Sequence, residues 1–168
     1  MSVEEKTASP AIPHNPVYVF IETMKTMPDG FSDEEELLEL RRLIKDANDS
    51  AKTNMTPSKK NLINARHSVF SKTGKRVLEE SPIHLAIKTF RHDVLWELLE
   101  CGADFGTLDS TGISPLERAC DFENLGAVNQ LLDRGVYAGK RRGKAYGPLD
   151  MTDNKKIHTV IRNALKYY

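Results

Sequence analysis

Residues 81–104, S-P-I-H-L-A-I-K-T-F-R-H-D-V-L-W-E-L-L-E-C-G-A-D, decide the fold. Pro82 suits the first turn of a helix, because its missing N–H would be unpaired there anyway. Apolar residues then recur at helical spacing in two short segments, and Gly102 can take the left-handed conformation that ends the second segment. Helices this short are not stable alone, so the stretch predicts a helix pair that a neighbouring unit must cover.

The same pattern returns at a step of 33 residues. Ser114-Pro115-Leu116 opens a second copy. Gly147-Pro148-Leu149 opens a third, whose first helix is expected to be short and polar. This period, with S-P-I-H-L-A at its head and L-L-x-x-G-A-D at its tail, resembles the ankyrin repeat. The resemblance covers about residues 72–168.

The resemblance implies an all-α fold, an ankyrin-like stack of helix-turn-helix repeats with short β-hairpin loops. These loops, called fingers below, correspond to the linking segments 72–80, 105–113 and 136–146. The ankyrin pattern has a glycine between the two helices of a repeat, whereas this sequence has Phe90, Glu123 and Lys156 there. Since glycine serves a permissive backbone, we expect inter-helix turns that depart from the family pattern.

The chain divides into three parts. Residues 1–14 are polar, contain two prolines and are expected to be flexible. Residues 15–70 are predicted to form a helical N-terminal cap, which would shield the apolar end of the stack. Residues 71–168 are predicted to form the ankyrin-like repeats.

Three helices are expected in the cap. The first covers about residues 16–27; its segment 17–24 is rich in β-branched and aromatic residues, but we find no partner strand in the sequence. The second covers about residues 33–47 and begins at a capping box headed by Ser32. The third starts near Thr56-Pro57 with apolar residues up to position 70. An alternative interpretation of this segment is a degenerate first repeat.

Composition limits the classes of partner. The 168 residues carry 24 basic and 24 acidic side chains, so no global attraction to nucleic acid or an acidic membrane follows. Cys101 and Cys120 fall on different predicted helices and are expected to be reduced thiols. No apolar run reaches the length of a signal peptide or a membrane span, so we expect an intracellular protein, cytoplasmic and/or nuclear, with no membrane partner.

No arrangement of residues typical of an enzyme is present. The sequence lacks G-x-S-x-G, a phosphate-cradling glycine loop and H-E-x-x-H, so we expect no catalysis, cofactor or metal. His84 falls at the motif histidine of the repeat, whose family role is to bond backbone groups of adjacent fingers. The other four histidines have no spacing that would build a metal site, and His67 and His92 are expected to face solvent on helices.

The sharpest local charge feature is the basic finger, residues 140–144, K-R-R-G-K. Tyr137 and Tyr146 flank it, and aromatic rings beside basic residues suit single-stranded bases. The basic finger fits phosphate groups of nucleic acid, an acidic protein surface, or a solvated loop tip. Trp96, on the second helix of the first copy, fits either an interface or packing over a neighbouring helix.

The resemblance implies a non-enzymatic protein–protein interaction adaptor, which binds a partner segment through the concave surface of fingers and first helices. Carried over position by position, the contact residues on the fingers are Lys75, Val77, Leu78, Glu80, Leu108, Ser110, Thr111, Ile113, Arg141, Arg142, Lys144 and Tyr146. Those on the first helices are Lys88, Thr89, Asp121 and Phe122.

The chemistry of these positions indicates the kind of partner. The apolar members, which would be exposed, are Val77, Leu78, Leu108, Ile113, Phe122 and Tyr146. Exposed apolar groups beside a basic finger fit a partner segment that is apolar with acidic residues. Two alternatives stay open: an RNA-binding adaptor that uses the basic finger, and docking through residues 17–24 with the stack as their support.

Overall fold

The computed structural model describes residues 16–24, 34–53, 63–64, 66–70 and 73–167. The segment 1–14, predicted to be flexible, lies outside these residues. Within them the chain is mostly helical, with one two-stranded sheet. No described helix combines the length and the apolarity that crossing a membrane requires.

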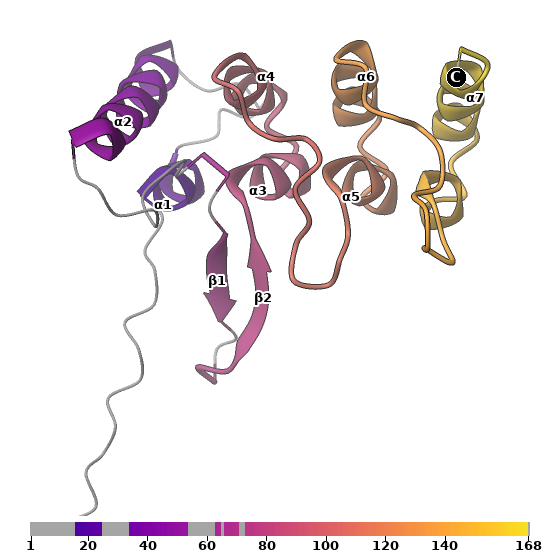
Figure 1. Cartoon of the computed structure of the whole chain (residues 1–168), viewed down its shortest axis with the longest axis horizontal. Coiled ribbons are helices and arrows are strands. Elements are labelled where there is room, and N and C mark those ends of the chain that lie inside the picture. Colours follow the sequence, from indigo (N-terminus) through magenta and orange to yellow (C-terminus); the bar gives the residue numbers. More distant parts are fainter. Residues whose placement is uncertain (1–15, 25–33, 54–62, 65, 71–72, 168) are drawn as a thin grey trace, which may run out of the picture.

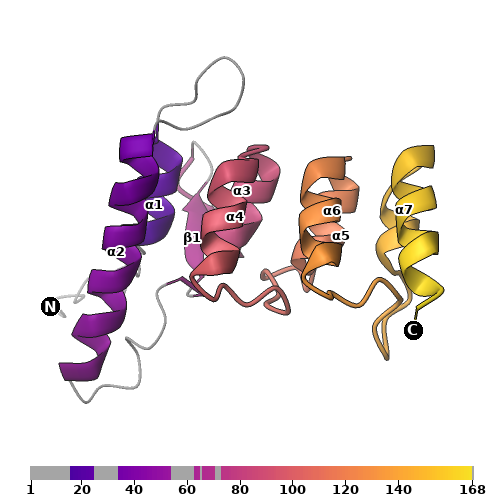
Figure 2. The same ribbon diagram turned by 90° about the horizontal axis from the view of Figure 1, so that it is seen from above.

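The helices lie in two rows that run along the molecule (Figure 1). The inner row consists of α1 (Pro16–Thr23), α3 (Pro82–Lys88), α5 (Pro115–Asp121) and the 3-10 helix η2 (Pro148–Met151). The outer row consists of α2 (Glu34–Thr53), α4 (His92–Glu100), α6 (Leu125–Asp133) and α7 (Lys155–Leu165). Successive members of each row pack on one another, as α1 does on α3 and α4 does on α6 (Figure 2). The predicted stack of two-helix units at a 33-residue step is confirmed.

Local sequence sets where the repeat helices begin. Ser114 Oγ accepts from the Glu117 N–H at 3.3 Å, and Glu117 Oε2 accepts from the Ser114 N–H at 2.8 Å, which is a capping box. Asn124 caps α6 by accepting from the Ala127 N–H at 3.0 Å. In the third copy, Pro148 opens only the four-residue η2, as its short polar sequence predicted.

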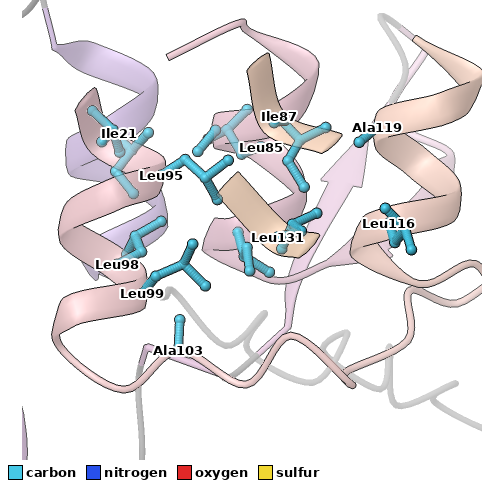
Figure 3. Close-up of a cluster of buried hydrophobic side chains, with 14 of the residues drawn as sticks. Ile21, Leu85, Ile87, Leu95, Leu98, Leu99, Ala103, Leu116, Ala119 and Leu131 are labelled. Carbon is cyan, nitrogen blue, oxygen red and sulfur yellow. The ribbon is translucent and has the colours of Figure 1, made fainter. Parts of the chain in front are cut away.

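One apolar core runs between the two rows through the whole stack. Figure 3 shows Ile21 of α1 in the same cluster as Leu95 and Leu98 of α4 and Leu131 of α6. Val17 and Ile21 are buried and α1 packs on α3, so α1 shields the N-terminal side of the core. The buried residues of this segment therefore face the stack, while docking of a partner on residues 17–24 stays a prediction.

Helix α1 takes the place of a repeat's first helix. It begins 66 residues before α3, which is two steps of the repeat, and yet it packs directly on α3. Tyr18 in α1 is equivalent to His84 in α3, and each bonds to the residue two positions before the next inner helix. Tyr18 Oη donates to Glu80 Oε1 at 2.8 Å, and His84 Nε2 lies 3.2 Å from Ile113 O. The unit that packs on the first repeat is thus the α1–α2 pair. Thr56-Pro57, where a further helix was expected to begin, lies outside the described residues.

The predicted helix that ends at residue 70 is wrong in its last part. Strand β1 (His67–Phe70) pairs antiparallel with β2 (Arg76–Glu80), with His67 opposite Glu80. A strand draws its hydrogen bonds from another segment, so the local apolar pattern does not reveal it. Helix α2 matches its prediction but continues to Thr53.

The first finger is this β-hairpin, as expected from the resemblance. Residues 105–113 and 136–146 contain turns but no strand, so the expected hairpins are absent from these two fully described fingers. In the second finger the Asp109 N–H donates to Ile113 O and the Gly112 N–H donates to Asp109 O, both at 3.0 Å. Gly112 has φ of 78°, which suits this tight turn.

The inter-helix turns keep a left-handed residue without glycine. Phe90 has φ of 57° and Glu123 has φ of 52°, so the expected departure from the family geometry is wrong in these two copies. Such a backbone costs a residue with a Cβ about 1–2 kcal/mol. Only the third copy differs: Lys156 lies inside α7, whose first N–H groups donate to the Asn154 side chain.

Candidate partner-binding surface

The fingers project on one side of the stack, next to the inner row (Figure 1). We call the surface of the fingers and the exposed sides of α3 and α5 the finger face. The Ser110 N–H donates to Glu79 O and the Glu79 N–H donates to Ser110 Oγ, both at 2.8 Å. The Lys144 ammonium donates to Gly112 O at 3.0 Å. These bonds connect the three fingers into one surface.

His84 is a structural residue, as predicted. Its side chain is fully buried, with Nδ1 2.9 Å from Ser81 Oγ and Nε2 3.2 Å from Ile113 O. Because the Ile113 carbonyl can only accept, Nε2 carries the proton and Nδ1 accepts from the Ser81 hydroxyl. Burial lowers the pKa of His84, which keeps the ring neutral. The imidazole therefore joins the first repeat to the second finger.

Glu80 is not available to a partner, contrary to its expected place on the contact surface. Its side chain is fully buried and accepts from Tyr18 Oη at 2.8 Å and from the Lys88 ammonium at 2.9 Å. Burial and the Glu80 carboxylate both raise the pKa of Tyr18, which therefore remains a donor. Glu80 and Lys88 thus join β2, α1 and α3 instead of pointing to a partner.

Asp109 organises the second finger. Its Oδ1 accepts from the Thr111 N–H at 2.9 Å, from Thr111 Oγ1 at 2.6 Å and from the Ile113 N–H at 3.0 Å. Its other oxygen pairs with Arg118. Burial by itself raises the pKa of Asp109, but these hydrogen bonds outweigh burial and lower the pKa to about 2. The carboxylate therefore stays charged and fixes the turn.

The basic finger divides into structural and exposed cations. Arg141 Nη2 lies 2.6 Å from Glu117 Oε2, whose side chain is buried, and also donates to Gly112 O at 2.8 Å. Lys144 donates to the same carbonyl. Lys140 and Arg142 are exposed and form no ion pair within the described residues. The basic finger thus presents fewer free charges than its sequence suggests.

The apolar residues expected on the finger face are exposed to different degrees. Tyr146 is 66% exposed and Phe122 is 37% exposed. Leu78, Leu108 and Ile113 are half-buried, and the side chain of Val77 lies outside what the structure describes. The polar residues among the expected contacts that are exposed are Lys75, Thr89, Ser110, Thr111, Asp121, Arg142 and Lys144. Of these, Asp121 pairs with Arg118 at 2.9 Å.

Three aromatic residues lie against neighbouring elements. The Arg134 guanidinium lies 4.8 Å from the centre of the Trp96 ring, so a residue from the end of α6 covers part of Trp96 while 48% of its side chain stays exposed. His92 Nε2 bonds to Asn124 Oδ1 at 2.7 Å, and the His67 ring stacks on Tyr18 at 4.5 Å. The expectation that these two histidines face solvent is wrong, and His67 lies on a strand.

Sequence reasoning missed a pocket of about 210 Å³ between the second and third fingers. Its apolar lining includes Phe105, Leu116 and Tyr137, and the Arg141–Glu117 pair lies at its side. The signal in the sequence was Tyr137, which stands where the first copy has Asp104. The pocket has room for one apolar side chain of a partner.

Other chemistry is sparse in the part of the chain that the structure describes. No group of three histidine, cysteine or carboxylate side chains is placed to hold a metal ion there. Cys101 and Cys120 are both free thiols. Burial raises the pKa of Cys120 to about 12, so this thiol stays protonated and unreactive at neutral pH.

Comparison with known proteins gives matches among solved structures only. No family model matches the sequence, and no curated protein matches it. Among solved structures, the chain is similar to the crystal structure of the human ASB11 ankyrin repeat domain, with 24% sequence identity and a TM-score of 0.45. The similarity covers 50% of this chain and 38% of that chain, so this chain spans well under half of its length. The repeat stack itself is established by the two helix rows and their 33-residue step.

Proposed function

We propose that this chain is a non-enzymatic protein-interaction adaptor, which binds a segment of a partner protein across the finger face. The observation that carries the proposal is the exposure of Phe122 and Tyr146 on a face whose fingers are joined to one another by hydrogen bonds. Aromatic side chains dominate binding energy at protein interfaces. A face that is already ordered loses little conformational entropy when a partner binds.

The expected partner segment is apolar with acidic residues. Phe122 and Tyr146 supply apolar contact, while Lys140 and Arg142 supply exposed positive charge beside Tyr146. The structure removes Glu80 from the expected contact set and gives Arg141 a structural role. Charge reversal at Arg141 would break its pair with buried Glu117, so Arg142 is the better position for testing surface charge.

The test is affinity capture with three forms of the full chain, with the retained proteins identified by mass spectrometry. The first form is the wild type and the second carries Phe122→Ala and Tyr146→Ala. The third carries Leu38→Ala and Trp96→Ala, which remove two side chains of the outer row that are 54% and 48% exposed. We expect the partner to be lost from the second form and kept by the third.

The opposite pattern, loss only from the third form, would place the partner on the outer row and contradict the proposal. Circular dichroism of all three forms checks that the stack is folded. The adaptor also predicts no turnover by the purified chain, and any small-molecule turnover lost in the Phe122 and Tyr146 variant would contradict its non-enzymatic character.

RNA binding through the basic finger is the second candidate function, favoured by Lys140 and Arg142 beside the exposed ring of Tyr146. Binding to nucleic acid falls steeply with salt, because neutralised phosphates release counterions. Titration with a short single-stranded RNA at two salt concentrations tests this function. Tight binding that weakens with salt and is lost in Tyr146→Ala would favour RNA over a protein partner.

A further inference from the structure

The net charge of zero conceals a strong division of charge along the stack. Residues 134–168 contain nine of the 24 basic residues and two of the 24 acidic residues, a net charge of +7. Residues 1–133 therefore carry a net charge of −7. Charge separated in this way along one axis creates a directional field, which steers and orients charged partners even when the net charge is zero.

Much of the positive charge at this end is exposed and unpaired. Elsewhere, basic side chains commonly face carboxylates, as Arg41 does on Glu97 at 2.5 Å and Lys88 does on Glu80 at 2.9 Å. Five exposed cations at the C-terminal end form neither an ion pair nor a side-chain hydrogen bond within the described residues: Lys140, Arg142, Lys155, Lys156 and Arg162. We call these five side chains the basic end.

Two of these cations lie at a helix N-terminus, where negative charge is preferred. Lys155 and Lys156 occupy the first turn of α7, which contains no acidic residue. The N-terminus of a helix carries partial positive charge and favours carboxylates, as in α2, whose first turn holds three glutamates. Local rules of this kind are broken most often where function requires it.

The third finger adjoins the C-terminal part of α7. A hollow of about 250 Å³ is lined by Lys140 of the third finger and by Leu165 near the end of α7, with Asp150 also in the lining. Figure 2 shows the C-terminal end of α7 beside the loop that leaves α6. All five cations thus lie on the last unit of the stack, with Lys140 beside the C-terminal part of α7. Lys155 and Lys156 lie at the other end of this helix, where Asn154 Nδ2 is 3.4 Å from Glu123 Oε2.

We propose that the basic end binds a run of acidic residues in a polypeptide partner, which fixes the direction in which that partner lies along the finger face. The inference rests on the proposed function in taking the partner to be a polypeptide. A nucleic acid is uniformly anionic, so a strand longer than the basic end would meet the net negative charge of residues 1–133. A polypeptide can confine its acidity to the length that faces the cations.

The test is fluorescence anisotropy with the full chain and three labelled probes. The probes are decaglutamate, a ten-residue peptide of alternating glutamate and lysine, and a ten-nucleotide oligouridylate. The patch variant carries Arg142→Gln, Lys156→Gln and Arg162→Gln. The matched control carries Lys75→Gln, Arg42→Gln and Lys45→Gln, which also removes one exposed finger cation and two exposed cations of an outer-row helix.

We expect decaglutamate to bind the wild type, to weaken as salt rises, and to lose at least about fivefold in affinity in the patch variant. The matched control should change affinity less than about twofold, and the alternating peptide should not bind. Equal losses in both triple variants, or no decaglutamate binding at low salt, would overturn the proposal. Tighter binding of oligouridylate than of decaglutamate, lost in the patch variant, would assign the basic end to nucleic acid instead.

These outcomes separate this inference from the proposed function. Neither triple variant changes Phe122 or Tyr146, so failure of partner capture in the earlier experiment leaves the decaglutamate result unaffected. Conversely, a partner could be captured through Phe122 and Tyr146 and yet have the same affinity for the wild type and the patch variant. That result would leave the adaptor function in place and contradict the binding role proposed for the basic end.

Discussion

Glu80 joins three elements through one buried carboxylate. It lies at the end of β2 and accepts from Tyr18 of α1 and Lys88 of α3. A buried carboxylate is costly unless it is paired and hydrogen-bonded, so each donor contributes to keeping the N-terminal pair on the stack. The equivalent position in the next repeat is Ile113, whose carbonyl accepts a hydrogen bond from His84.

Removing one of these donors should weaken the fold. Tyr18→Phe keeps the buried ring but removes the hydroxyl that donates to Glu80. We expect the free energy of unfolding to fall by about 1–2 kcal/mol, measured by urea denaturation. Tyr146→Phe, at a residue that is 66% exposed, is the matched control and should change it by less than about 0.5 kcal/mol. Equal effects of the two changes would contradict the role given to the Tyr18–Glu80 bond.

Asp109 should make stability depend on acid pH. Its pKa is about 2 in the fold against an ordinary 3.8, so the unfolded chain takes up the proton first as pH falls. The stabilisation is therefore complete above about pH 4 and is lost as pH falls toward 2. Asp109→Asn should lower the free energy of unfolding by roughly 2 kcal/mol at pH 7, with a smaller deficit at pH 3, measured by urea denaturation at both values.

The comparison needs a control that leaves the turn intact. Asp121→Asn removes an exposed partner of the same Arg118 without touching the finger. Its effect should stay below about 0.5 kcal/mol at both pH values. A deficit for Asp109→Asn that is constant between pH 7 and pH 3 would show that the charge of Asp109 does not stabilise the finger.

At the scale of elements, the turn between α3 and α4 holds a residue in an unfavourable conformation. Phe90 has φ of 57° and its side chain is 47% exposed, so its backbone costs free energy while its ring buries little surface. Phe90→Gly should raise the free energy of unfolding by about 0.5–1 kcal/mol. Thr89→Gly is the control: Thr89 has φ of −93°, so this change should lower the free energy of unfolding by a similar amount. Thermal unfolding of both variants measures the difference. Destabilisation by Phe90→Gly would mean that its ring packs more than its exposure indicates.

Helix α7 should gain stability when a cation in its first turn is replaced by an anion. Lys156→Glu replaces a cation with an anion at the positive end of the helix dipole, so we expect a gain of about 0.3–1 kcal/mol. Lys166→Glu makes the reverse change at the other end and should destabilise the helix by a similar amount. Both are measured by thermal unfolding at low salt, and high salt should reduce both effects. A loss of stability in Lys156→Glu would show that the cation at position 156 does not destabilise the N-terminus of α7.

At the scale of the whole molecule, the stack couples neighbours along one axis. Each helix pair packs mainly on the pair beside it, so a destabilising change in α1 should destabilise α3 more than α7. Ile21→Ala removes a buried side chain and should cost about 2–5 kcal/mol. Hydrogen exchange should quicken more in α1 and α3 than in α7. Glu22→Ala, exposed on the same helix, is the control, and equal quickening in α7 would refute one-dimensional coupling.

The sequence alone determined the repeat stack. The 33-residue step, the prolines at helix starts and the apolar spacing are local features, so they predicted α3 to α7 and the weak first helix of the third copy. They also predicted the structural role of His84, because its position in the repeat already defines which backbone it meets. The exposed aromatic residues Phe122 and Tyr146 followed from the same frame.

Only the tertiary structure decided the features that depend on contacts with distant segments of the chain. Strand β1 required the hydrogen bonds of β2, and Glu80 became buried because Tyr18 arrives from α1. Arg141 turned inward because Glu117 lies within reach on α5. Each of these outcomes is a contact between segments that are far apart in the chain, with its energy set by burial and partner geometry. A local pattern records which residues a helix offers, but not which charge or strand will meet them.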